Sequence, residues 1–190
     1  MTPPPRPSAP VLFLHGLESG PTGSKARLLA ARFGALAVDL DTSAARASAA
    51  EAAAAGQPWA RPWPSIEAAF TTPMARARAA IGPETRLIVG SSFGGAVLER
   101  LLAAGDWRGP SLLLASAGGK LNGPRRLPAG VPVILIHGRQ DDLVPVHDSR
   151  WLAEGAGPLV RLWERDDDHR LSGALSAGVI EAAAAELLGG

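Results

Sequence analysis

The segment GSSFGG, residues 90–95, has the residue types of a serine nucleophile held in a sharp turn. An apolar run precedes it, a helix-forming stretch follows it, and Ser92 is the centre of a G-x-S-x-G pattern. In such a strand-to-helix turn the flanking positions must be small because the backbone is crowded. An idle serine would leave this spacing of glycines unexplained, so the pattern predicts Ser92 as a nucleophile. Ser91 is one position out of frame and is expected to point elsewhere.

A serine hydroxyl needs a general base, and the chain contains 4 histidines. His15 and His137 each end an apolar run and precede a glycine, where the ring is expected to hold a loop. His147 is a weak candidate because it stands at the start of an expected helix. His169 lies in a polar loop after the last expected strand, at the end of a parallel sheet where active sites gather. The sequence therefore predicts His169 as the base.

A carboxylate is needed to orient that imidazole and to stabilise its cation. The stretch ILIHGRQDDLVP, residues 134–145, is an apolar run followed by a turn that carries Asp141 and Asp142. An acid in this turn gives the chain order serine, aspartate, histidine. That order is the one found in α/β-hydrolase triads and differs from the orders in chymotrypsin and subtilisin.

The elements that must position these residues follow from the alternation of short apolar runs with helical patterns. This alternation predicts a mostly parallel sheet of about six strands with helices on both faces. Thr72 followed by Pro73 suggests an N-cap and first helical position. A stripe of apolar residues repeating every four positions predicts one long final helix. The expected strands are residues 11–14, 35–40, 85–89, 111–116, 131–137 and 159–163, and the expected helices are residues 24–33, 72–80, 94–104, 147–154 and 172–188.

Four segments in order resemble the α/β-hydrolase superfamily over nearly the whole chain: HG at 15–16, GSSFGG, HGRQDDLVP and DHRL at 168–171. The resemblance implies the α/β-hydrolase fold. It carries the acid over to Asp141, leaving Asp142 as a solvated turn residue, and the base to His169. The stretch between residues 116 and 131 is too short for a large lid. The chain is thus similar to small cap-less bacterial esterases and to depalmitoylating thioesterases.

The glycine-rich stretch HGLESGPTGSKA, residues 15–26, could be a phosphate loop or half of an oxyanion hole. A Walker A loop needs lysine directly after its second glycine and then a hydroxyl residue, whereas Lys25 follows a serine and precedes Ala26. The expected oxyanion donors are the backbone amides of Phe93 and, by resemblance to the family's HGx motif, Leu17. The side chains of Glu18 and Lys25 are expected to face solvent, with contact to the substrate as the alternative.

Composition limits the class of protein. A chain of 190 residues with a net charge of +1 favours one globular domain, residues 11–190, after a flexible N-terminal tail, residues 1–10. Scattered basic residues give nucleic-acid binding little support, and no apolar run is long enough to span a membrane. The absence of cysteine excludes thiolate chemistry and disulfides. The cytoplasm is the default location because the N-terminus does not resemble a signal peptide.

These observations together predict a serine hydrolase that acts on carboxylic esters and needs no metal or organic cofactor. An acyl thioesterase is the nearest alternative, because Lys120, Arg125 and Arg126 could attract a phosphorylated thiol carrier. A non-catalytic small-molecule binder, a lyase or a perhydrolase on the same fold stays open, and so do the acyl group and the oligomeric state. Trp59 and Trp63 are expected to cover the core, with a substrate cleft as their alternative role.

Overall fold

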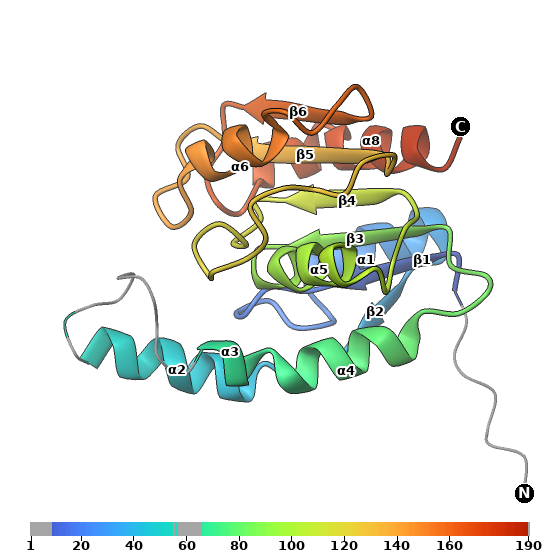
Figure 1. The fold of residues 1–190 in the computed structure, drawn as a ribbon. Coiled ribbons are helices and arrows are strands. Elements are labelled where there is room, and N and C mark those ends of the chain that lie inside the picture. The colour runs from blue at the N-terminus through green and yellow to red at the C-terminus, as the bar shows by residue number, and fades with distance from the viewer. Residues whose placement is uncertain (1–8, 55, 57–65, 190) are drawn as a thin grey trace, which may run out of the picture.

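The computed structural model describes residues 9–54, 56 and 66–189. Its six strands form one parallel sheet in the order β2-β1-β3-β4-β5-β6 (Figure 1). All six strands expected from the apolar runs are present, with ends shifted by no more than two residues, which confirms the predicted parallel α/β architecture. The strands are β1 (Val11–Leu14), β2 (Leu36–Val38), β3 (Leu87–Ser91), β4 (Ser111–Leu114), β5 (Val133–Gly138) and β6 (Val160–Arg165).

Helices cover both faces of the sheet, so its central strands are buried on both sides (Figure 1). Alternate residues of each strand point to opposite faces. In β1, Leu12 and Leu14 pack into the core beneath α2 to α6, whereas Val11 and Phe13 pack into the core beneath α1, α7 and α8. This explains why the strands read as continuous apolar runs. The helices are α1 (Ser24–Phe33), α2 (Ser43–Ala54), α3 (Ile66–Ala69), α4 (Thr71–Ala80), α5 (Phe93–Ala104), α6 (Val146–Ala153), α7 (Ser172–Ser176) and α8 (Val179–Leu187).

Two helix predictions were wrong in ways that local chemistry explains. The single helix expected over residues 172–188 is two helices, because Gly178 takes a left-handed conformation with φ of 71° and ends the first of them. The expected cap at Thr72 is also wrong: α4 begins at Thr71, with Phe70 as its N-cap. Pro73 still lies in the first turn, where its missing N–H has no intrahelical acceptor to lose.

The alanine-rich stretch after residue 42 is not among the helices expected from the sequence, but it forms the helix α2. Alanine has the highest intrinsic helix propensity, and Ala45 and Ser48 provide a small buried face. The helix packs against α3 below the sheet edge (Figure 1). None of the helices in the described part of the chain is long and apolar enough to cross a membrane.

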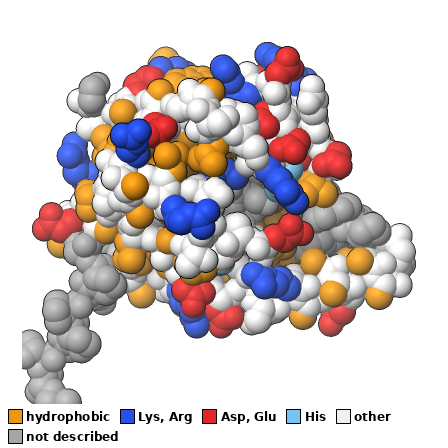
Figure 2. Space-filling model, turned by 180° about the vertical axis from the view of Figure 1, so that it is seen from behind, with side chains coloured by type: hydrophobic (Ala, Val, Ile, Leu, Met, Phe, Trp, Pro, Cys, Tyr) orange, Lys and Arg blue, Asp and Glu red, His pale blue; other side chains and the backbone are white. Residues whose placement is uncertain are grey.

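The face covered by α1, α7 and α8 carries acidic and basic side chains interspersed with one another (Figure 2). An ion pair between Arg32 on α1 and Glu181 on α8, at 2.7 Å, joins two of the covering helices. Exposed pairs of this kind contribute less than about 1 kcal/mol, so the apolar core beneath them dominates the packing.

The order in which successive strands join the sheet reverses between β1 and β3. After β1 it continues to β2 on one side, and it later returns to β3 on the other side of β1. Leu14 at the end of β1 is level with Val38 of β2 and Gly90 of β3. In open parallel sheets the crevice beyond the carboxyl ends at such a point is where ligands bind. The turn that carries Ser92 and the loop that follows β1 both start here.

Glu99 is a buried carboxyl group on α5, which lies on the sheet face that α2 to α6 cover. It is 1% exposed, and Ser116 Oγ donates to its Oε1 at 2.6 Å. Its Oε2 has no hydrogen-bond partner among the described residues, and the side chain borders a cavity of about 160 Å³ together with Ser116 and Asp148. Burial raises the pKa of Glu99 to about 7, although the bond from Ser116 opposes that shift.

Glu99→Gln is expected to remove a loss of stability that accompanies rising pH. The folded-state pKa lies above the ordinary value of 4.5, so the native state holds an extra proton between these values. The free energy of unfolding therefore falls by about 3 kcal/mol between about pH 4.5 and pH 7 and then stays level. Urea unfolding at pH 5 and pH 8 checks this, with the exposed Glu51→Gln as control. A wild-type pH dependence retained in Glu99→Gln would contradict it.

Candidate active site

The turn between β3 and α5 consists of Ser92 alone. β3 ends at Ser91 and α5 begins at Phe93, and Ser92 has φ of 54° and ψ of −113°. This is a strained conformation for a residue with a side chain. A Cβ atom at Gly94 would lie 2.0 Å from Leu14 O, and one at Gly90 would lie 2.6 Å from Gly94 O. The glycines are therefore required for this turn, as the pattern predicts.

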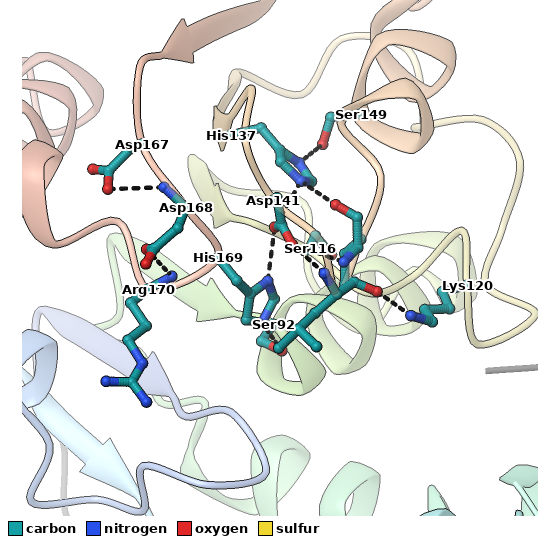
Figure 3. Close-up of polar contacts among 12 residues, drawn as sticks. Ser92, Ser116, Lys120, His137, Asp141, Ser149, Asp167, Asp168, His169 and Arg170 are labelled. Atoms are coloured by element: carbon teal, nitrogen blue, oxygen red, sulfur yellow. Dashed lines mark hydrogen bonds and ion pairs between the residues drawn. The ribbon is translucent and has the colours of Figure 1, made fainter. Parts of the chain in front are cut away.

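The structure brings together the three side chains that the sequence singles out (Figure 3). His169 Nε2 lies 2.9 Å from Ser92 Oγ, and His169 Nδ1 lies 2.7 Å from Asp141 Oδ2. A carboxylate can only accept, so Nδ1 carries the proton and Nε2 accepts from the serine hydroxyl. In this tautomer the unprotonated Nε2 of His169 faces the hydroxyl of Ser92 and can take its proton. Ser92 and His169 are half-buried, so a substrate can reach them from solvent.

Asp141 is held by four donors. Leu143 N and Val144 N donate to Oδ1 at 3.0 and 2.7 Å, while His169 Nδ1 and His137 Nε2 lie 2.7 and 3.1 Å from Oδ2. Burial alone would raise the pKa of Asp141, but bonds from His137, His169 and Val144 outweigh it and hold that pKa well below its ordinary range. The group is therefore a carboxylate at every pH at which a histidine could act as a base.

His137 has a part in the site that sequence reasoning did not assign. Besides Asp141, its Nε2 faces the carbonyl of Val144 at 2.9 Å, and its Nδ1 lies 2.7 Å from Ser149 Oγ on α6 (Figure 3). The ring thus holds the turn after β5, as predicted, and it also fixes the acid of the site. The only signal in the sequence was the four-residue spacing between His137 and Asp141.

The loop after β1 lies directly against the nucleophile. A Cβ atom at Gly16 would be 3.3 Å from Ser92 Cβ, and one at Gly94 would be 2.7 Å from His15 O. The next residue in the loop is Leu17, and Phe93 N belongs to the first turn of α5, whose amides have no intrahelical acceptor. The amides of Leu17 and Phe93 are thus on the two segments that flank Ser92. His15 itself accepts from Leu40 N at 3.2 Å, which is the structural role expected for it.

The remaining candidates lie outside this group of side chains. Asp142 and His147 are exposed, and Ser91 is buried within β3. Glu18 is exposed as expected. Trp59 and Trp63 lie outside the described residues.

Most of the basic side chains that the sequence singles out contact other residues of the protein. Lys120 Nζ donates to the carbonyl of Leu143, next to the two amides that hold Asp141 (Figure 3). The guanidinium of Arg125 lies 4.7 Å above the ring of Trp151, and Arg126 is exposed. The expectation that Lys25 faces solvent was wrong, because its Nζ donates to the carbonyl of Arg170.

Within the described ranges, no cluster of histidine, aspartate and glutamate side chains could hold a metal ion. The cavity beside Glu99 is lined by none of Ser92, Asp141 and His169, so it is separate from the group around the nucleophile. The chemistry that this group offers is attack by an activated hydroxyl beside backbone amides.

Comparisons with known proteins give structural similarity over nearly the whole chain. A protein from Xanthomonas campestris pv. campestris assigned as a hydrolase of the alpha/beta superfamily is 25% identical, with a TM-score of 0.66 over 95% of this chain and 96% of that one. Est1E from Butyrivibrio proteoclasticus is 15% identical, with a TM-score of 0.65 over 98% and 91% of the two chains. The esterase RhEst1 from Rhodococcus sp. ECU1013 is 15% identical, with a TM-score of 0.61 over 95% and 90%. No protein-family model and no curated protein sequence matches the chain.

Proposed function

This chain has the fold of the α/β-hydrolase superfamily, and on that premise we propose that it is a serine hydrolase that cleaves carboxylic esters through an acyl-enzyme. The observation that carries the proposal is the hydrogen-bonded series Ser92, His169, Asp141 at the switch point of the sheet. Fold alone would not support an activity, since unrelated functions share this architecture. Structural neighbours that are named hydrolases and esterases add support.

In the first half of the reaction, Ser92 Oγ attacks the ester carbonyl carbon while His169 Nε2 takes the hydroxyl proton. The carbonyl oxygen becomes an oxyanion, which the amides of Leu17 and Phe93 stabilise. Asp141 stabilises the imidazolium without accepting its proton. The tetrahedral intermediate then collapses, the C–O bond to the alcohol breaks, and His169 gives its proton to the departing oxygen.

In the second half, water replaces the alcohol. His169 takes a proton from this water, whose oxygen attacks the acyl carbon on Ser92. Collapse of the second intermediate returns the proton to Ser92 Oγ and releases the carboxylic acid. Proton and bond changes balance without a redox partner, and the same oxyanion donors serve both halves.

Esters are favoured over thioesters of a phosphorylated carrier. The thioesterase alternative depends on free cations, but Lys120 and Arg125 are already engaged with Leu143 and Trp151. A non-catalytic binder would have no need for the strained turn at Ser92, which has the conformational cost of a functional site.

We expect nitrophenyl esters with short acyl chains to be hydrolysed with kcat/KM at least about tenfold above that for the matching acyl-CoA thioesters, because Lys120 and Arg125, two of the three cations that could attract an anionic carrier, already contact other residues of the protein. The measurement is a hydrolysis profile over acyl chain length with both leaving groups. Arg126→Ala serves as the matched variant. A preference for acyl-CoA that weakens in Arg126→Ala would favour the thioesterase instead.

A further inference from the structure

Lys25 joins the start of α1 to the loop that carries the base. It lies in the first turn of α1, and its Nζ donates to the carbonyl oxygen of Arg170 at 2.6 Å, across 145 positions of sequence. Arg170 directly follows His169. An ammonium donor makes a shorter and stronger bond to a carbonyl than a neutral donor does. The contact therefore ties the backbone beside His169 to α1.

A second anchor holds the other side of the same loop. Gln140 N donates to the carbonyl of Asp167 at 3.1 Å, and a Cβ atom at Gly138 would lie 2.2 Å from that same oxygen. The loop is thus packed tightly against the turn that carries Asp141. His169 lies between these two anchors, with Asp167 on the β5 side and Arg170 on the α1 side.

Within the loop, hydrogen bonds organise the segment but do not fix it to α1. Asp168 Oδ1 accepts from Arg170 N at 2.8 Å, and Asp167 Oδ1 accepts from Asp168 N at 3.0 Å (Figure 3). Asp167 Oδ2 also accepts from Ala174 N at 2.7 Å, which connects the loop to α7. Among the hydrogen bonds of the described residues, the one from Lys25 connects this loop to the segment that also carries Leu17.

The charges around Lys25 agree with this role. Burial lowers the pKa of Lys25, and the nearby carboxylates of Asp167 and Asp168 oppose that shift. A partly buried ammonium that donates to a carbonyl and is attracted by nearby carboxylates is restricted in where it can lie, unlike a freely solvated lysine. Its side chain thus holds a defined position between α1 and the loop.

We propose that Lys25 is a positioning residue for the base: by holding the carbonyl of Arg170 it sets His169 Nε2 within reach of Ser92, and it couples the loop of the base to the segment that carries Leu17. The proposal rests on the hydrolase function proposed above. A displacement of about 1 Å in a reacting group can lower a rate about 100-fold, so a tie of this kind has a measurable effect on turnover.

Lys25→Met is expected to lower kcat for ester hydrolysis by about 10- to 100-fold with KM within about twofold, because the substrate still binds but the base is misplaced. Lys25→Arg keeps a cationic donor and is expected to recover most of kcat. Arg86→Met is the matched control, since Arg86 likewise donates to a carbonyl, that of Leu188 at 2.8 Å, and is expected to leave kcat unchanged.

Hydrogen exchange separates this proposal from the proposed function. Faster exchange in the peptide that contains residues 166–171 is expected in Lys25→Met and not in Arg86→Met, whether or not the protein is active. Unchanged exchange there, an unchanged kcat, or an equal loss in Lys25→Arg would overturn the positioning role. If wild type lacks Ser92-dependent turnover, the hydrolase function fails and the positioning role fails with it, even though the exchange result would still establish the tie. If Lys25→Met does not fold, Lys25→Gln takes its place with the same expected losses.

Discussion

Ser92→Ala is expected to lower kcat for ester hydrolysis by about a million-fold, the loss typical when the nucleophile of such a triad is removed. The methyl group of alanine cannot form the acyl-enzyme, and His169 is left without a proton to take. The protein should still fold, because alanine occupies the strained turn with fewer atoms than serine and leaves the glycine contacts around it intact. Steady-state kinetics with a short-chain nitrophenyl ester, beside a circular dichroism spectrum, measures the effect.

Ser91→Ala is the matched control for this variant. Ser91 precedes Ser92 in the sequence, but it is the last residue of β3 and is buried there. Its removal is expected to leave kcat within about tenfold of wild type, because its hydroxyl has no part in the reaction. Full activity in Ser92→Ala, or an equal loss in both variants, would contradict the assignment of the nucleophile.

Asp141→Asn is expected to lower kcat by about 10⁴-fold, although it changes the shape of the side chain very little. Leu143 N and Val144 N both donate to Oδ1, so the amide oxygen of asparagine must take that place. Its NH₂ group then faces Nδ1 of His169. A donor there forces the imidazole proton onto Nε2, which can no longer accept the proton of Ser92.

The neighbouring aspartate provides the control for this second substitution. Asp142 is exposed and has the same charge, so Asp142→Asn is expected to retain wild-type kcat. Both variants are compared by kcat over a range of pH with one ester substrate. Loss of activity in Asp142→Asn, with activity retained in Asp141→Asn, would contradict the assignment of Asp141 as the acid.

Local chemistry explains why so much of the fold and the site could be predicted. The strands are short apolar runs because both faces of the sheet are covered, and the turn at Ser92 needs glycines within four residues of it. Ser92, Asp141 and His169 come together because each follows a parallel strand, and the carboxyl ends of these strands lie at one edge of the sheet. Each of these signals is contained in a few adjacent residues.

What the sequence did not reveal depends on contacts between distant residues. The contact from Lys25 to Arg170 spans 145 positions, and nothing near Lys25 indicates its partner. Burial of Glu99 depends on how closely the segment around Gly118 approaches α5: a Cβ atom there would lie 1.7 Å from Glu99 Oε2. The break between α7 and α8 was missed because the apolar stripe continues past Gly178 into the same core.

A fluorophosphonate probe reacts with the activated serine of a serine hydrolase, so identification of the labelled residue tests whether Ser92 is the nucleophile. Trypsin should release residues 87–100 as one peptide, which contains both Ser91 and Ser92, so fragmentation within that peptide is needed to separate them. We expect one adduct, on Ser92, that is absent after mild denaturation of the protein before labelling. An unlabelled native protein, or an adduct on Ser91 or elsewhere, would contradict it.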